Sequence, residues 1–237
     1  MAEVDAGTTG TRTDPRSAAK EAAGRHAATY VESGMRVGLG TGSTVHFTIV
    51  ALGERVRSGD LEIRCVATST QTENLANSVG LKVEQPDLVR HLDIAIDGAD
   101  EVDQRLNLTK GGGGALTREK IVATMADRFI VVVDDSKLVP QLGRFGTPIE
   151  VLRFAPEVVA DQVRSLGAAE VRFRPEASDN GALLADAFFG EIPDPTGLAS
   201  ALQAVPGLIE HGLFLSSMVD RVVVAESDGS VREISNP

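Results

Sequence analysis

The chain has 237 residues, of which 42% are hydrophobic and 24% charged, as is ordinary for a globular protein with one large domain or two modest ones. The net charge of −11 disfavours DNA or RNA as a partner, although a small anion could bind in a pocket that focuses a few cations. Cys65 is the only cysteine, which excludes an intrachain disulfide and fits a reducing compartment. The polar first twenty residues predict no secretory signal, and no apolar run approaches the length of a membrane span.

Strands and helices alternate in the first part of the chain. Residues 1–13 predict a flexible tail, and Asp14-Pro15 should start a helix that ends near Ser33, before Gly34. Strands are expected at 35–40, 62–68, 92–97 and 128–135, with helices at 45–56, 70–80 and 116–126. This alternation predicts an α/β fold, in which a parallel sheet carries helices on its faces.

The order of elements changes after about residue 147. Strands are expected at 149–154, 169–174, 182–189 and 208–215, and helices at 156–167 and 194–207. The resulting β-α-β-β-α-β order is that of a ferredoxin-like unit. Residues 220–235 then predict a closing hairpin, which could rejoin the first sheet.

The stretch GLGTGST at residues 38–44 lies between a predicted strand and a predicted helix. Glycines there let backbone N–H groups approach a ligand, and a helix start favours an anion. A dinucleotide fingerprint would need glycine where Ser43 stands, and the lysine of a Walker loop is absent. We interpret the stretch as a phosphate site, the alternative being a plain strand-to-helix turn.

The stretch DGADE at residues 97–101 follows a predicted buried strand, at the end where ligands bind in open α/β sheets. Its carboxylates repel one another unless something compensates, and a solvated acidic turn or a cation site would be alternatives to a catalytic cluster. No EF-hand or HExxH spacing is present, so no metal site is predicted. The scattered histidines and the cysteine are expected to be ordinary core or surface residues: His26, His46, His91, His211 and Cys65.

The stretch KGGGGALTREK at residues 110–120 combines four glycines with two lysines and a glutamate. Successive glycines cost backbone entropy, which is reasonable where backbone amides line an oxyanion pocket. A flexible loop followed by surface ion pairs is the alternative. Lys110 together with Asp97, Asp100 and Glu119 would give a pocket that moves protons without a metal.

These three stretches, in this order and spacing, resemble the ribose-5-phosphate isomerase type A family. SDNG, DPTGLASALQAVPG and HGLF in the second half resemble it too, and the similarity extends from about Lys20 to the last hairpin. It implies a Rossmann-like, mostly parallel sheet domain (residues 14–147 and 221–237) and a smaller α+β ferredoxin-like domain (148–220). It further implies a cytoplasmic enzyme of the non-oxidative pentose phosphate pathway that interconverts ribose 5-phosphate and ribulose 5-phosphate without a metal or cofactor, as a homodimer or homotetramer.

The resemblance also implies roles for individual residues. Glu119 would be the general base that moves a proton between C2 and C1 through an enediolate. Lys110 and the amides after it would stabilise the oxyanion, Asp97 would help to open the sugar ring, and Asp100 would orient Lys110 or the sugar hydroxyls. The implied substrate-binding residues are Thr41, Gly42, Ser43, Thr44, Gly98, Ala99, Gly111, Gly112, Gly113, Lys137 and Lys20.

Two other functions are compatible with this general fold. A non-enzymatic phosphosugar sensor would usually carry a helix-turn-helix segment, but the region before Gly38 predicts one helix. A relative of the acyl-CoA transferases would use a catalytic glutamate, but no adenine or pantetheine site is evident.

Overall fold

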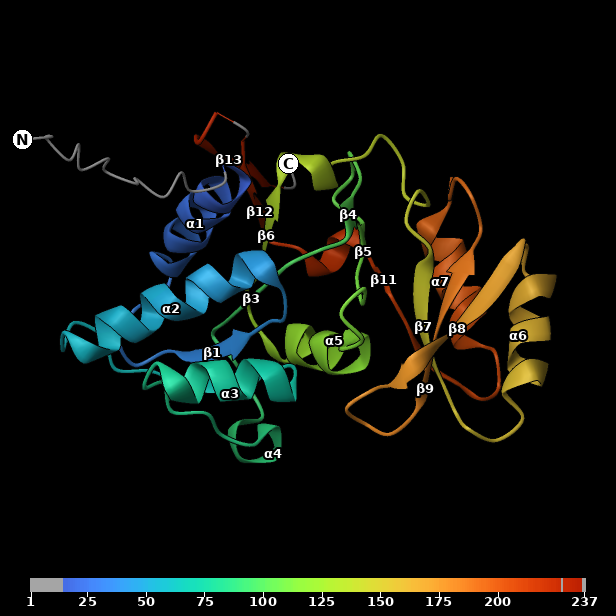
Figure 1. Cartoon of the computed structure of the whole chain (residues 1–237), viewed down its shortest axis with the longest axis horizontal. Coiled ribbons are helices and arrows are strands. Elements are labelled where there is room, and N and C mark those ends of the chain that lie inside the picture. Colours follow the sequence, from blue (N-terminus) through green and yellow to red (C-terminus); the bar gives the residue numbers. More distant parts are fainter. Residues whose placement is uncertain (1–14, 227, 236–237) are drawn as a thin grey trace, which may run out of the picture.

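The computed structural model describes residues 15–226 and 228–235, so the expected tail at residues 1–13 lies outside the described residues. The described strands form three sheets, of which the two larger ones lie side by side, each with its own helices (Figure 1). The larger sheet consists, in spatial order, of β13 (Val231–Ser235), β12 (Arg221–Ala225), β6 (Phe129–Asp134), β3 (Ile94–Asp97), β1 (Arg36–Leu39) and β2 (Arg64–Ala67). All neighbours pair in parallel except β13, which is antiparallel to β12, so the predicted closing hairpin does rejoin the first sheet.

Helices cover both faces of this sheet because its strands alternate apolar side chains between the two faces. Ile94 and Ile96 of β3 pack with α1 (Pro15–Ala28), α2 (Ser43–Arg57) and α3 (Thr70–Ser78), whereas Ala95 packs with α5 (Leu116–Met125) on the other face. A short helix, α4 (Pro86–Val89), precedes β3. Strands buried on both faces are typical of parallel sheets, and the predicted α/β class is confirmed.

The second sheet has the strand order β10-β7-β9-β8 and is antiparallel throughout. Its elements follow the predicted β-α-β-β-α-β order: β7 (Thr147–Val151), α6 (Pro156–Ser165), β8 (Glu170–Ala177), β9 (Leu183–Phe188), α7 (Pro195–Gln203) and β10 (Leu208–His211). A separate core lies between this sheet and its helices, with Val159 and Val163 of α6 and Leu202 of α7 in it. We call residues 147–211 the βαββαβ unit; its assignment as a separate domain stays a prediction.

The strand expected at 208–215 is interrupted at Gly212. Residues before it form β10 of the second sheet, and residues after it form β11 (Leu213–Phe214), which pairs with β5 (Leu108–Thr109) and through it with β4 (Glu101–Val102). A Cβ on Gly212 would lie 2.1 Å from the carbonyl oxygen of Lys110, so glycine is needed where the chain changes sheets. The first helix is also shorter than expected, because it ends at Ala28 rather than near Ser33.

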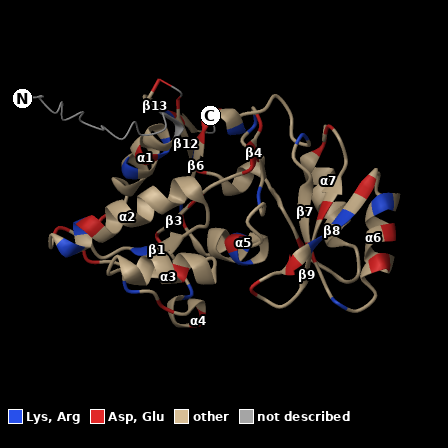
Figure 2. Cartoon of the chain, in the orientation of Figure 1, with Lys and Arg blue, Asp and Glu red and all other residues tan. Residues whose placement is uncertain are grey.

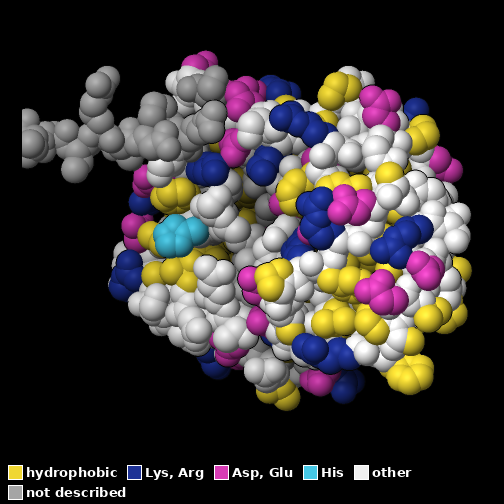
Figure 3. Space-filling model, turned by 45° about the vertical axis from the view of Figure 1, so that its right-hand side comes forward, with side chains coloured by type: hydrophobic (Ala, Val, Ile, Leu, Met, Phe, Trp, Pro, Cys, Tyr) yellow, Lys and Arg dark blue, Asp and Glu magenta, His cyan; other side chains and the backbone are white. Residues whose placement is uncertain are grey.

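The surface carries mixed charge, with acidic and basic residues close together along helix α6 (Figure 2). Most of the large exposed hydrophobic side chains lie in the βαββαβ unit, namely Leu152, Phe154, Val158, Leu166 and Ile209. Figure 3 shows hydrophobic side chains gathered on that half of the molecule. Among the described residues, no helix combines the length and apolar character needed to cross a membrane.

Candidate active site

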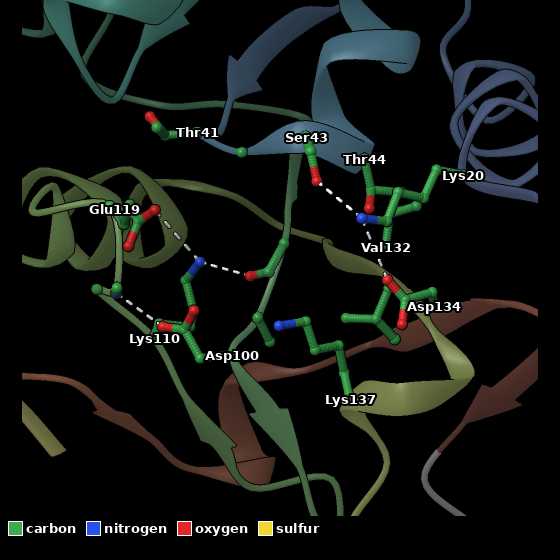
Figure 4. Close-up of a pocket in the computed structure, with 17 residues that line it drawn as sticks. Lys20, Thr41, Ser43, Thr44, Asp100, Lys110, Glu119, Val132, Asp134 and Lys137 are labelled. Atoms are coloured by element: carbon green, nitrogen blue, oxygen red, sulfur yellow. Dashed lines mark hydrogen bonds and ion pairs between the residues drawn. The ribbon is translucent and has the colours of Figure 1, made fainter. Parts of the chain in front are cut away.

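A cavity of about 170 Å³ lies at the carboxyl ends of β1, β3 and β6, which are neighbours in the larger sheet. The loops after these strands and the glycine run before α5 form its walls (Figure 4). The lining residues are Lys20, Thr41, Gly42, Ser43, Thr44, Gly98, Ala99, Asp100, Lys110, Gly111, Gly112, Gly113, Glu119, Val132, Val133, Asp134 and Lys137. The cavity is therefore where open α/β sheets usually bind ligands.

At one end of the cavity, a buried lysine lies among three oxygen atoms, two from the end of β3 and one from α5. The Lys110 ammonium is 3.0 Å from a carboxylate oxygen of Asp97 and 3.5 Å from one of Glu119, and it donates to the carbonyl of Gly98 at 2.6 Å. The Lys110 side chain is only 2% exposed. Burying one positive charge against two carboxylates lowers the cost of desolvating each of them. Phe214 closes the cluster from behind, with its ring centroid 5.4 Å from the ammonium.

Burial also changes the acidity of this cluster. Desolvation, followed by the charge of Asp97, raises the pKa of Glu119 to about 8, although Lys110 acts in the opposite direction. Desolvation likewise raises the pKa of Asp97. For Lys110 desolvation lowers the pKa, but the charges of Asp97 and Glu119 outweigh it and the net shift is upward. The ammonium thus stays charged while Glu119 can exchange a proton near neutral pH.

Glu119 projects from the first turn of α5, and one of its two carboxylate oxygens, Oε2, has no hydrogen-bond partner among the described residues. The other oxygen faces Lys110. A buried carboxylate oxygen without a donor is costly and therefore uncommon. Its position at the cavity wall leaves it available to a bound molecule.

Two glycines leave room for the acidic residues. A Cβ on Gly40 would lie 2.1 Å from Cγ of Asp97, and a Cβ on Gly112 would lie 2.6 Å from Oδ1 of Asp100. The Asp97 carboxylate also accepts from the backbone N–H of Thr41 at 3.0 Å and of Gly98 at 2.7 Å. Asp100 accepts from the N–H of Gly112 at 2.7 Å. Glycine is therefore needed at both positions, because any side chain there would collide with a carboxylate.

The opposite end of the cavity has the features of an anion site. Helix α2 begins there, and its N-cap residue Gly42 supplies no side-chain cap, so the first N–H groups face the cavity without a capping side chain. Lys20 donates to the Ser43 hydroxyl at 3.2 Å and lies 3.5 Å from Asp134. Lys137 projects into the cavity from the other side (Figure 4).

Fourteen of the fifteen predicted site residues line this one cavity. Asp97 is the exception, since it does not line the cavity, but its buried carboxylate lies 3.0 Å from the Lys110 ammonium, which does. Thr41 differs in another way: its hydroxyl is turned away from the cavity and contacts three other hydroxyl groups within 3.0 Å, those of Thr68, Ser69 and Thr72. Its backbone, rather than its hydroxyl, is near the carboxylates.

Three lining residues were not among the predicted ones: Val132, Val133 and Asp134. They end strand β6, and the position rule that identified DGADE after β3 applies equally to the VVVDD stretch of residues 131–135. Asp134 lies 3.5 Å from Lys20, and although desolvation raises its pKa, hydrogen bonds from Ser136 and the charge of Lys20 give a net lowering.

One group outside the cavity also brings possible metal ligands together. His91, Asp93 and Asp127 place one ligand atom each within 4.8 Å of one another. However, Arg36 occupies this group, because it donates to Asp93 and lies 2.8 Å from Nδ1 of His91. A positive guanidinium among the ligands disfavours a cation there.

Comparison with known proteins agrees with this architecture. The sequence profile of the family described as ribose 5-phosphate isomerase A (phosphoriboisomerase A) matches residues 64–229. The ribose-5-phosphate isomerase A of Thermomicrobium roseum is 50% identical over 218 residues, which cover 89% of this chain and 91% of that protein. Among solved structures, ribose 5-phosphate isomerase A from Methanocaldococcus jannaschii has a TM-score of 0.86 and 37% identity, covering 92% of this chain and 98% of its own. A D-ribose-5-phosphate isomerase in complex with phospho-erythronic acid has a TM-score of 0.88 and 38% identity, covering 92% and 97%. Both the sequence and the fold therefore assign this chain to the ribose-5-phosphate isomerase A family.

Proposed function

We propose that this chain interconverts D-ribose 5-phosphate and D-ribulose 5-phosphate through an enediolate, with Glu119 as the general base and no metal. The observation that carries the proposal is that one cavity has a proton-exchanging cluster at one end and an anion site at the other. A buried proton-exchanging carboxylate lies beside a buried ammonium at one end, and a helix start with two lysines lies at the other. Membership of the family supports the same reaction.

The phosphate group would bind at the start of α2. Backbone N–H groups of Ser43 and Thr44, with the ammonium groups of Lys20 and Lys137, supply hydrogen bonds and positive charge for a dianion. The related structure that holds phospho-erythronic acid, a phosphorylated four-carbon sugar acid, supports a phosphosugar as ligand. Binding energy from this unreactive end would hold the reacting carbons near Glu119.

The reaction needs a base and fixed donors. Glu119 would take the proton from C2 of the open-chain aldose and return it to C1, while a proton passes between the two neighbouring oxygens. The negative charge that develops on oxygen would be stabilised by Lys110 and by N–H groups of the glycine run. Because Asp97 contacts the Lys110 ammonium and does not line the cavity, we assign it to holding the ammonium, and we assign the sugar hydroxyls and ring opening to the cavity-lining Asp100.

The test is turnover of ribose 5-phosphate in the presence of EDTA, for the wild type and for Glu119→Gln. We expect an active wild type and a loss of roughly 10²–10⁴-fold in kcat for the variant, because a positioned general base contributes about that factor. Glu157→Gln is the matched control, since Glu157 is an exposed glutamate in the first turn of α6. Near-wild-type activity of Glu119→Gln would remove Glu119 from the role of base.

Binding and turnover assays on the wild type separate the alternatives. A folded wild type that binds ribose 5-phosphate but does not turn it over would indicate a phosphosugar sensor. Turnover of an acyl-CoA would indicate a transferase. Inhibition by EDTA that added divalent metal reverses would contradict a metal-independent mechanism.

We also propose that the protein is a cytoplasmic homodimer or homotetramer. The exposed hydrophobic side chains of the βαββαβ unit, including Phe154 at 87% exposure, support self-association through that half. Light scattering after size-exclusion chromatography would give the number of subunits, and a monomeric mass at micromolar concentration would contradict the proposal.

A further inference from the structure

Arg174, on strand β8 of the βαββαβ unit, contacts the glycine run from outside the cavity. Its Nη1 donates to the carbonyl of Gly111 at 2.9 Å and to the carbonyl of Gly112 at 3.2 Å. Asp186 on β9 accepts from Nε of Arg174 at 2.9 Å and also from Nη2, so two parallel hydrogen bonds fix the guanidinium. The Arg174 side chain is only 15% exposed, which limits its alternative positions.

The segment that Arg174 contacts is a β-turn. The N–H of Gly114 donates to the carbonyl of Gly111 at 2.9 Å, and neither central residue, Gly112 or Gly113, has a positive φ, as in a type I turn. A type II turn has the same closing bond, but the peptide between the central residues is turned over and the second of them has a positive φ. Glycine accepts both signs of φ, so this run by itself allows both turns. The Gly112 carbonyl belongs to the peptide that turns over, and Arg174 holds it in one orientation.

The Gly111–Gly112 peptide shows to which side the N–H groups of this turn point. A trans peptide points its C=O and N–H to opposite sides. In the Gly111–Gly112 peptide the carbonyl faces Arg174, and the N–H donates to the cavity-lining Asp100 at 2.7 Å. Arg174 itself lines a neighbouring hollow on the other side of the glycine run. With the Gly112 carbonyl also facing Arg174, the N–H of Gly113 faces the cavity.

We propose that Arg174 is a positioning residue for the isomerisation, because it selects the turn in which the Gly113 N–H faces the reacting oxygen. Donors that are already aimed at developing charge stabilise the transition state without reorganisation. A guanidinium on the carbonyl side also polarises the peptide, which strengthens its N–H as a donor. This proposal rests on the proposed function of the cavity.

The first test compares Arg174→Met with Arg172→Met in steady-state kinetics. Arg172 lies two residues earlier on β8 and pairs with the exposed Glu170, so it is a matched control that leaves the glycine run untouched. For Arg174→Met we expect kcat to fall by roughly 10- to 100-fold with little change in KM, which is less than the roughly 10²–10³-fold cost of losing an oxyanion donor because the Gly113 N–H is released rather than removed. Arg172→Met should keep the wild-type kcat.

Inhibitors separate positioning from general damage to the site. Phospho-erythronic acid carries a carboxylate that stands in for the enediolate oxygens, whereas inorganic phosphate occupies only the distant end. For Arg174→Met, the inhibition constant of phospho-erythronic acid should rise by about the factor lost from kcat, and that of inorganic phosphate should not change. Equal weakening of both inhibitors, or a wild-type kcat, would overturn the proposal.

A second substitution tests the turn itself. A Cβ at Gly113 would meet only Thr41, at 3.7 Å, so alanine fits the present turn, but it disfavours the positive φ of the other turn roughly tenfold. Arg174→Met/Gly113→Ala should therefore recover part of the kcat that Arg174→Met loses. A purely structural role for Arg174 would leave the double variant as slow as the single one.

Asp186→Asn covers the case in which Arg174→Met does not fold. It keeps the guanidinium but removes its charged partner. We therefore expect kcat to fall here too, by less than in Arg174→Met, and KM to stay unchanged. A change in KM alone would contradict the proposal. The wild-type rate measured alongside is the test of the proposed function, so an inactive wild type is distinguishable from an ineffective Arg174 variant.

Discussion

At the scale of single residues, Glu119 connects burial with pH dependence. Burial and the charge of Asp97 raise its pKa to about 8, so in the free protein the carboxyl holds its proton below that pH and loses it above. A general base acts only when deprotonated. We therefore expect kcat/KM for ribose 5-phosphate to rise with pH between 6.5 and about 9, with its half-maximal value near pH 8, and then to level off. A stopped-time assay over this range gives the profile, and a flat or falling curve would contradict the assignment.

The same pKa shift makes a prediction about stability. A carboxyl whose pKa is higher in the folded than in the unfolded chain destabilises the fold increasingly as pH rises between the two values, here from about 4.5 to about 8. Glu119→Gln removes this term. We expect its melting temperature to exceed that of the wild type by an amount that grows between pH 5 and pH 9.

The exposed Glu157 supplies the control for that measurement. Glu157→Gln should differ from the wild type by the same small amount at every pH, because its side chain is solvated in both states. A stability difference for Glu119→Gln that does not depend on pH would show that its carboxyl titrates alike in the folded and unfolded chains.

At the scale of elements, Glu150 of β7 attaches helix α5 to the second sheet. It is fully buried and accepts hydrogen bonds from Thr117 in the first turn of α5, from Ser178 at 2.6 Å and from Asn180 at 3.1 Å. We expect Glu150→Ala to lower the free energy of unfolding by on the order of 3 kcal/mol, because several buried donors lose their acceptor. We also expect kcat to fall a few-fold, because Thr117 is two residues from Glu119 on the same helix and its release would shift the base.

Denaturant unfolding and kcat measured together would check this prediction. Glu170→Gln on the neighbouring strand β8 is the control, since Glu170 is exposed and pairs only with Arg172 in the described part of the chain. A Glu150→Ala variant with unchanged stability would mean that the three donors find water or other acceptors.

The elements also show what the sequence could and could not predict. Short apolar runs separated by helical segments predicted the strands of the two larger sheets. The anion preference of a helix start identified GLGTGST and the carboxyl-end rule identified DGADE, and residues of both stretches line the one cavity. The change of sheet at Gly212 was not predictable, because LIEHGLFL has the length and apolar content of a single strand, and it is the contact of Gly212 with the Lys110 backbone that divides it. Arg174 was missed for a similar reason: its partners are backbone carbonyls 62 and 63 positions away, which leave no local pattern.

At the scale of the whole molecule, the net charge of −11 opposes folding through self-repulsion. Surface ion pairs such as Arg25–Glu54 contribute little to stability, so screening them costs little. Raising NaCl from about 0.01 M to 0.1 M shortens the screening length from about 30 Å to about 10 Å. We expect the melting temperature to rise over this range, as scanning calorimetry would show. A lower melting temperature at higher salt would mean that attractive pairs outweigh the repulsion.

The change of sheet at Gly212 also ties the two halves of the molecule together mechanically. Gly212 accepts from the backbone N–H of Lys110 at 2.8 Å and donates to the carbonyl of Pro148 at 2.7 Å. Two successive backbone hydrogen bonds thus connect the cavity-lining Lys110 with strand β7 of the second sheet. A rotation of the second sheet that stretched these bonds would pull directly on the backbone of Lys110. These two hydrogen bonds oppose a hinge between the sheets at this point, so we expect closing motions around a bound sugar to occur mainly in the loops.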